Sequence, residues 1–200
     1  MKTASLVAAL AALAIPFAAH ANAGVGQAAP AFTLTDIHGK SVNLADFRGR
    51  TVVLEWHNFG CPFVQKHYGS GNMQALQKKY GADVAWLTVN STSTASPDYM
   101  KPAALDARLH EVGAAPADYL MDDPGSVGRA YGAKTTPHMF IIDPQGIVVY
   151  NGAIDDKRSA NPEDVKIARN YVAAALDEMK AGKPVTTATT APYGCSVHYR

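Results

Sequence analysis

The chain has 200 residues, enough for one domain with a sizeable core and too few for two domains of ordinary size. Its 18 lysines and arginines nearly balance its 17 acidic residues, which gives a formal net charge of +1. The basic residues form no cluster of the kind that binds phosphates. We therefore expect no nucleic-acid partner.

Residues 1–23 have the pattern of a signal peptide. Lys2 is followed by an alanine- and leucine-rich run, residues 4–19, that is too short and too weakly flanked to span a bilayer. Small residues spaced for a signal peptidase occur at 19–21 and again at 21–23. We expect a periplasmic or secreted protein that has no stable membrane insertion after cleavage.

A hairpin and a buried strand come first in the predicted domain. Apolar and polar residues alternate over 31–44 around a turn at 38–40, and Thr51–Trp56 is a nearly unbroken apolar run typical of a central strand. Cys61 follows this strand. Pro62 suits the first turn of a helix, where its missing N–H costs nothing. The pattern therefore predicts that Cys61 lies near a helix N-cap.

Helices and strands alternate through the rest of the domain. The first helix is expected to break at 69–71 and to end at Gly81. The later elements expected are a strand at 82–89, a helix at 97–112, a short strand at 119–121, a short helix at 126–131, and strands at 138–142 and 147–150 around a turn at 143–146.

The end of the domain is predicted to be one long helix. Asn161-Pro162-Glu163-Asp164 opens it with an N-cap and acidic residues, and Val165, Ala168, Val172, Ala175 and Met179 mark its buried face. The charged residues 155–158 before it are expected to form a solvated loop. The predicted domain thus covers residues 24–182, and residues 183–200 are a tail that carries Cys195.

Several motifs occur in a fixed order: Gln27–Leu34, Gly39-Lys40, the strand ending at Cys61-Pro62, Thr136-Pro137, and Phe140–Asp143 with Gly146. Together they resemble the redoxin branch of the thioredoxin superfamily, which includes the peroxiredoxin-like alkyl hydroperoxide reductase/thiol-specific antioxidant proteins and periplasmic thioredoxin-like reductases. The resemblance implies an α/β, thioredoxin-like fold. Its central mixed sheet has helices on both faces, with an N-terminal hairpin and a C-terminal tail.

The resemblance also implies site residues. Cys61 is the reactive thiol, because free N–H groups and the dipole at a helix N-terminus favour the nucleophilic thiolate. Pro62 starts the helix, and Thr136-Pro137 is the loop that is held cis and faces the thiol. His138 follows this loop, so we rank it above His57 as a hydrogen-bond partner or base for Cys61.

Differences from the peroxiredoxins and from the thioredoxins bear on the mechanism. Peroxiredoxins have a proline and a threonine ahead of the reactive cysteine, where this chain has Leu54 and Asn58, and an arginine at about the position of Pro137. Thioredoxins use Cys-x-x-Cys, whereas this chain has Cys61-Pro62-Phe63-Val64. Thiol–disulfide exchange and peroxide reduction therefore both stay open, and Cys195 is the internal candidate for a resolving thiol.

The prediction is a thiol-dependent oxidoreductase without a cofactor, whose partners are a thiol reductant or disulfide-bearing protein, or a peroxide. An external thiol that resolves Cys61 is one alternative to Cys195. A second is a non-catalytic protein with a structural Cys61–Cys195 disulfide. A third is a copper or zinc site built from the cysteines and the histidines His57, His67, His138 and His198.

Overall fold

The computed structural model describes residues 23–200. The predicted signal peptide lies outside the described residues except for Ala23, so it stays a prediction. The strands are β1 (Thr33–Asp36), β2 (Ser41–Asn43), β3 (Thr51–Trp56), β4 (Val84–Asn90), β5 (Asp118–Met121), β6 (Thr135–Thr136), β7 (His138–Ile142), β8 (Val148–Gly152) and β9 (Cys195–Ser196). The helices are α1 (Pro62–Gly69), α2 (Asn72–Tyr80), α3 (Pro102–Val112), α4 (Ser126–Tyr131) and α5 (Tyr171–Lys180), with 3-10 turns at Leu44–Phe47 and Pro162–Lys166.

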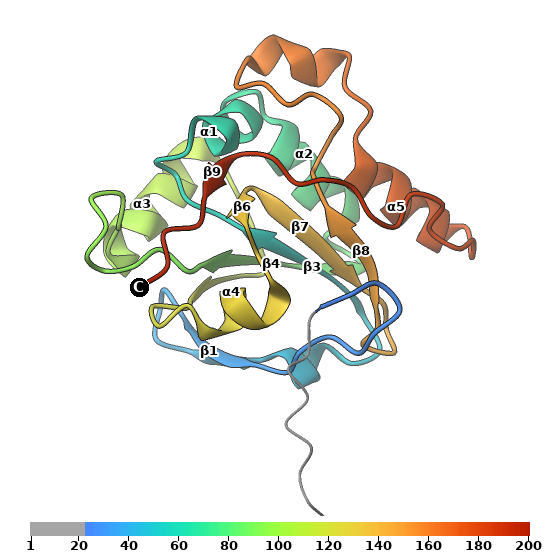
Figure 1. Ribbon diagram of the computed structural model, residues 1–200, viewed down its shortest axis with the longest axis horizontal. Helices are drawn as coiled ribbons and strands as arrows, with labels where there is room; N and C mark the ends of the chain where they lie inside the picture. Colours follow the sequence, from blue (N-terminus) through green and yellow to red (C-terminus); the bar gives the residue numbers. More distant parts are fainter. Residues whose placement is uncertain (1–22) are drawn as a thin grey trace, which may run out of the picture.

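A mixed sheet with the order β2-β1-β5-β4-β3-β7-β8 forms the centre of the fold (Figure 1). β3 pairs in parallel with β4 and antiparallel with β7, so it is central, as its apolar run predicts. Odd-numbered β3 residues such as Val53 pack with α1, α2, α3 and α5, and even-numbered ones such as Leu54 pack with α4. The predicted thioredoxin-like architecture, a mixed sheet with helices on both faces, is confirmed.

Two predicted helix boundaries are wrong. α3 begins at Pro102 and not at residue 97, because the residue before a proline avoids helical geometry and Lys101 is extended, with ψ of 153°. The helix predicted from Asn161 is two elements. The turn Pro162–Lys166 ends first, and a new helix starts where the Asn170 side chain accepts a 2.8 Å hydrogen bond from the backbone of Ala173.

This break changes which residues of the segment are buried. Val172 and Ala175 are buried as predicted, whereas Val165, Ala168 and Met179 are half-buried. The loop before the break also differs from its prediction, because Asp155 is 1% exposed.

Within residues 23–200, no helix is both long enough and apolar enough to cross a membrane.

Candidate active site

The loop between β3 and α1 positions Cys61. The Asn58 side chain accepts a 2.7 Å hydrogen bond from the Gly60 N–H and donates one of 3.1 Å to Thr92 Oγ1. A Cβ atom at Gly60 would lie 3.1 Å from Asn58 Oδ1 and 3.2 Å from the Asp98 carboxylate. A side chain at this position would be tight against both groups, and a carboxylate lies beside the residue that precedes Cys61.

Cys61 occupies the N-cap of α1 with extended backbone geometry, φ −81° and ψ 123°, and Pro62 follows at the first helical position. Both placements agree with the sequence pattern. Within the described part of the chain, no side chain caps the first turn of α1. The sulfur therefore stands where a capping oxygen would stand, at the positive end of the helix.

The Thr136–Pro137 peptide bond is cis, as the resemblance implies, and this loop faces Cys61. The Cys61 thiol donates a 3.0 Å hydrogen bond to the carbonyl oxygen of Thr136. Cys61 is only 2% exposed. An external reactant therefore reaches the Cys61 sulfur only after the segments that cover it move.

His138 supports the cis-proline loop and does not contact Cys61 through either ring nitrogen. Its Nδ1 accepts a 3.1 Å hydrogen bond from the backbone of Lys134, and its Nε2 lies 2.9 Å from Asn151 Oδ1. Burial lowers the pKa of His138 to about 4, so the ring is neutral and its Nε2–H donates to Asn151. With both nitrogens bonded, His138 has no capacity left to act as a base for the thiol.

The C-terminal tail brings the second cysteine to the first. β9 pairs antiparallel with β6, so that Cys195 lies opposite Thr136 (Figure 1). The Cys195 N–H donates to Cys61 Sγ at 3.4 Å, across 134 positions of sequence. Because N–Cα is about 1.5 Å, the Cα of Cys195 lies within about 5 Å of that sulfur. Both cysteines are free thiols, and the backbone of Cys195 lies beside the sulfur of Cys61.

The environment of Cys195 favours its protonated thiol. Burial is the largest cause that raises the pKa of the Cys195 thiol, followed by its hydrogen bond to Cys61, the charge of Cys61 and the charge of Asp98. Two of these causes come from Cys61 itself. They vanish when the Cys61 sulfur is bound in a mixed disulfide.

A buried acid on β3 was missed by the sequence reasoning. Glu55 is fully buried, and its carboxylate accepts hydrogen bonds from Trp86 Nε1 at 2.9 Å and from the Tyr68 hydroxyl at 3.1 Å. Burial raises the pKa of Glu55 to about 7, and the hydrogen bonds from Trp86 and Tyr68 oppose the rise. A lone glutamate inside an apolar strand was the signal that could have found it.

The histidines of the metal alternative do not converge. Among residues 23–200, no group of three or more histidine, cysteine or acidic side chains is arranged to hold a metal ion. Each histidine instead has its own polar neighbour: Tyr119 for His57, Tyr193 for His67, Asn151 for His138 and Ser96 for His198.

A thiol at the start of a helix, beside a cis-proline loop and above a central mixed sheet, defines a redoxin of the thioredoxin superfamily. The family model described as "AhpC/TSA family" matches residues 25–151. The chain belongs to the AhpC/TSA family, which confirms the resemblance read from its motifs.

Known relatives agree with this assignment. The chain is 27% identical over 126 residues to the thiol-disulfide oxidoreductase ResA of Bacillus thuringiensis, a match that covers 62% of this chain and 67% of that protein. A crystal structure of an uncharacterized conserved protein from Geobacillus kaustophilus has 28% identity and a TM-score of 0.76, covering 89% of this chain and 93% of that one. The thiol-disulfide oxidoreductase relative confirms the prediction of a thiol-dependent oxidoreductase.

The fold also matches the thioredoxin domain of a thiol-disulfide oxidoreductase from Bacteroides vulgatus. That structure has a TM-score of 0.52 and 23% identity, covering 72% of this chain and 96% of the domain. At this identity the match shows the fold alone, and it confirms the predicted thioredoxin-like class.

Proposed function

We propose that the protein catalyses thiol–disulfide exchange, with Cys61 as the attacking thiol and Cys195 as the resolving thiol. The observation that carries this proposal is the 3.4 Å contact between the Cys195 N–H and Cys61 Sγ. A resolving cysteine must reach the sulfur of the attacking cysteine, and this one already lies beside it. The names of the ResA relatives favour disulfide-bearing proteins and thiol reductants as partners.

The proposed reaction has two exchange steps. The Cys61 thiolate attacks one sulfur of a substrate disulfide, a mixed disulfide forms, and the other substrate sulfur leaves as a thiolate. Cys195 then loses its proton and attacks the Cys61 sulfur, which forms the Cys61–Cys195 disulfide and releases the second substrate thiol. The substrate gains two electrons that the protein loses, and a reduced dithiol returns the protein to its starting state.

The pKa of Cys195 supports this order. Part of its rise comes from the hydrogen bond to Cys61 and the charge of Cys61, which keep Cys195 protonated while Cys61 is free. Once Cys61 is bound to the substrate, those two causes are gone and Cys195 ionises more readily. Resolution then follows attack.

A peroxide is the second candidate oxidant, favoured by membership of the AhpC/TSA family. In that case Cys61 becomes a sulfenic acid as the peroxide is reduced, and Cys195 condenses with it to the same disulfide with loss of water. In the described part of the chain, the hydrogen bonds to the Cys61 sulfur involve backbone groups of Thr136 and Cys195 and no arginine. This favours exchange over peroxide reduction.

Export to the periplasm or the exterior is part of the proposal. The pattern of residues 1–23 supports it, and so does a pair of cysteines that a disulfide-permissive compartment suits. Fractionation of cells that express the full chain, with the mass of the mature protein measured, tests this part. Full-length protein in the cytoplasm would contradict it.

The test of the reaction follows the two cysteines by mass spectrometry. Reduced protein is mixed with a disulfide peptide and, separately, with hydrogen peroxide. Wild type is expected to form the Cys61–Cys195 disulfide with the peptide, Cys195→Ser to stop at a mixed disulfide on Cys61, and Cys61→Ser to form neither. Faster oxidation by peroxide than by the peptide would favour the second candidate, and an inert Cys61 would refute both.

A further inference from the structure

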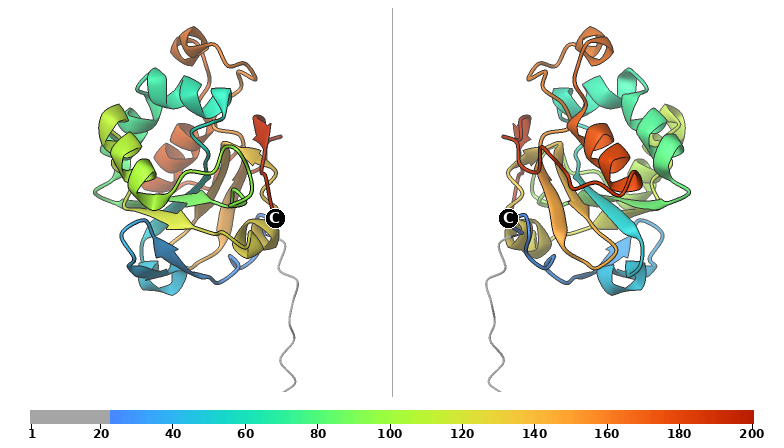
Figure 2. Two further views of the ribbon diagram at one scale, coloured as in Figure 1. Left: turned by 90° about the vertical axis from the view of Figure 1, so that its left-hand side faces the viewer. Right: turned by 90° about the vertical axis from the view of Figure 1, so that its right-hand side faces the viewer.

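Residues 185–200, which we call the strap, run from near the end of α5 across the molecule to β9 and the C-terminus (Figures 1 and 2). The strap brings Cys195 beside Cys61. Beyond Cys195 the strap is tied to the domain by backbone and side-chain bonds. The Ser93 N–H donates to the His198 carbonyl at 2.7 Å, and the Tyr199 hydroxyl donates to the Ala133 carbonyl at 2.7 Å. The strap is therefore fixed to the domain after Cys195.

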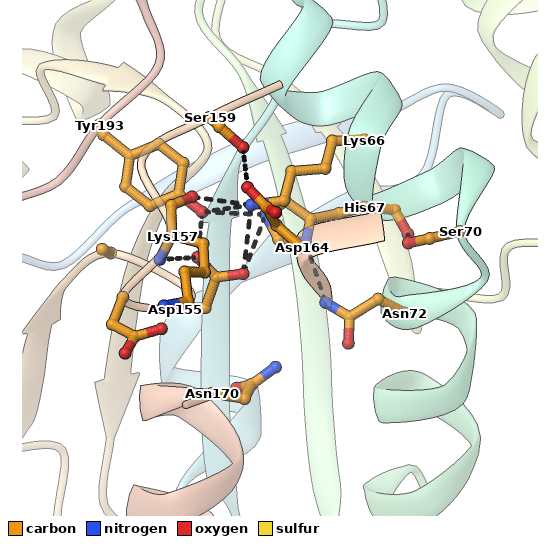
Figure 3. Close-up of polar contacts among 12 residues, drawn as sticks. Lys66, His67, Ser70, Asn72, Asp155, Lys157, Ser159, Asp164, Asn170 and Tyr193 are labelled. Carbon is orange, nitrogen blue, oxygen red and sulfur yellow. Dashed lines mark hydrogen bonds and ion pairs between the residues drawn. The ribbon is translucent and has the colours of Figure 1, made fainter. Parts of the chain in front are cut away.

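Before Cys195, the strap is anchored by Tyr193 in a buried polar cluster (Figure 3). The Tyr193 hydroxyl donates to Asp155, lies 3.2 Å from His67 Nε2 and lies 3.4 Å from Lys66 Nζ. Lys66 Nζ also lies 3.4 Å from Asp155 Oδ2 and donates to the Lys157 carbonyl at 2.7 Å. One hydroxyl of the strap thus joins two residues of α1 to an acid of the loop after β8.

The hydrogen bonds of this cluster are mutually consistent. Asn72 donates to His67 Nδ1 at 2.9 Å, so the proton of the neutral ring is on Nε2 and points to the Tyr193 oxygen. Burial is the main cause that lowers the pKa of His67 to about 4 and that raises the pKa of Tyr193. The hydroxyl therefore stays neutral, accepts from His67 and Lys66, and donates to Asp155.

Burial makes these contacts strong. The side chains of Lys66 and His67 are 0% exposed, and that of Asp155 is 1% exposed. Charged groups without water bind their hydrogen-bond partners more strongly than exposed ones. Loss of the Tyr193 hydroxyl would leave the buried Lys66–Asp155 ion pair with one hydrogen-bond partner fewer.

Gly194 links the anchor to the reactive cysteine. A Cβ atom at this position would lie 2.0 Å from the Thr136 carbonyl oxygen, and its φ of +137° is one that residues other than glycine rarely adopt. The strap backbone therefore lies directly on β6 between Tyr193 and Cys195. A single residue, whose backbone rests on β6, thus separates the buried Tyr193 from Cys195.

We propose that Tyr193, held by Lys66, His67 and Asp155, is a latch that positions Cys195 on Cys61 and closes the strap over the thiol. Tyr193 is thus a positioning residue for the resolving step, and this inference rests on the exchange reaction proposed above. The latch has two opposite effects on catalysis. It hinders the attack on substrate, because Cys61 is 2% exposed while the strap is docked, and it assists the resolution that follows.

The effects of the latch on the attack and on the resolution can be measured separately, because the strap is docked to a different degree at each step. In the reduced protein the docked strap covers Cys61. In the mixed disulfide, the bound half of the substrate competes with the strap for the space over Cys61, so docking there depends on the strength of the latch. A weaker latch should therefore speed the first step and slow the second.

Tyr193→Phe tests the latch with an aromatic disulfide that releases one coloured nitrobenzoate thiolate at each step. The hydroxyl contacts charged groups, so we expect the first release to be about tenfold faster and the second about tenfold slower than in wild type. Tyr80→Phe is the matched control. The Tyr80 hydroxyl donates to Asp177 at 2.8 Å, and both of its releases should keep wild-type rates.

The results separate the latch from the reaction. A second release at the wild-type rate in Tyr193→Phe would overturn the latch and leave the exchange reaction standing. A wild type that releases one thiolate and stops at the mixed disulfide would overturn resolution by Cys195 itself. If Tyr193→Phe does not fold, as judged by its thermal melt, His67→Leu removes a neutral donor from the same hydroxyl and should show the same opposite changes.

Discussion

The buried acid on β3 gives the protein a measurable dependence of stability on pH. Glu55 has an ordinary pKa of 4.5 and a folded-state pKa of about 7, because burial disfavours its charge. Between these pH values the folded chain holds a proton that the unfolded chain has lost, so the free energy of unfolding falls as pH rises. The difference between 4.5 and 7 corresponds to a loss of about 3 kcal/mol that is complete above pH 7.

Glu55→Gln removes this loss while an amide keeps an acceptor for Trp86. Urea denaturation at about pH 4 should find the two proteins equally stable, and at about pH 8 the variant should be more stable by up to about 3 kcal/mol. Burial lowers the pKa of His57 to about 3 and of His67 and His138 to about 4, so these residues make stability rise with pH up to about 6.5.

Comparison with wild type isolates the contribution of Glu55, because His57, His67 and His138 are present in both proteins and their contributions cancel. The quantity to plot is the difference in unfolding free energy between variant and wild type against pH. It should rise between pH 4.5 and 7 and be flat on either side. A difference that stays constant through this window would refute the assignment of a raised pKa to Glu55.

Other predictions concern the second cysteine and the last helix. Gly194→Ala forces a Cβ atom against the Thr136 carbonyl, so the second thiolate release should slow at least about tenfold; an unchanged rate would contradict the tight contact. Cys61→Ser should lower the pKa of Cys195, followed by thiolate absorbance, because the thiol hydrogen bond and the charge of Cys61 are lost; an unchanged midpoint would show that Cys61 contributes nothing to the raised pKa. Asn170→Ala removes the cap of α5 and should cost about 1 kcal/mol in urea denaturation, and equal stability would show that the cap is dispensable.

The sequence predicted those parts of the fold whose signals are local. The apolar run Thr51–Trp56 predicted β3 with its observed bounds, and Pro62 after Cys61 predicted the start of α1. In each case a few adjacent residues determine the structure. The cap at Asn170 is equally local, but the apolar spacing on both sides of it favoured a continuous helix.

The contacts of the strap could not be predicted because they join distant segments. β6 and β9 have two residues each, too few for an alternating pattern, and their pairing depends on the tertiary fold. The charged run that contains Asp155 predicts a solvated loop. The burial of Asp155 follows from Lys66 and Tyr193, and neither is near it in the sequence.

The lack of a second cysteine in α1 and the presence of the buried cluster have one explanation. A Cys-x-x-Cys motif fixes both thiols by one turn of helix, whereas this chain must bring Cys195 from the C-terminal strap. Lys66 and His67, which hold the strap through Tyr193, lie on the same helix whose N-cap is Cys61. α1 therefore positions both thiols, the first through its own N-terminus and the second through Tyr193. A change in the last turn of α1 should thus alter the resolving step even where the environment of Cys61 is left unchanged.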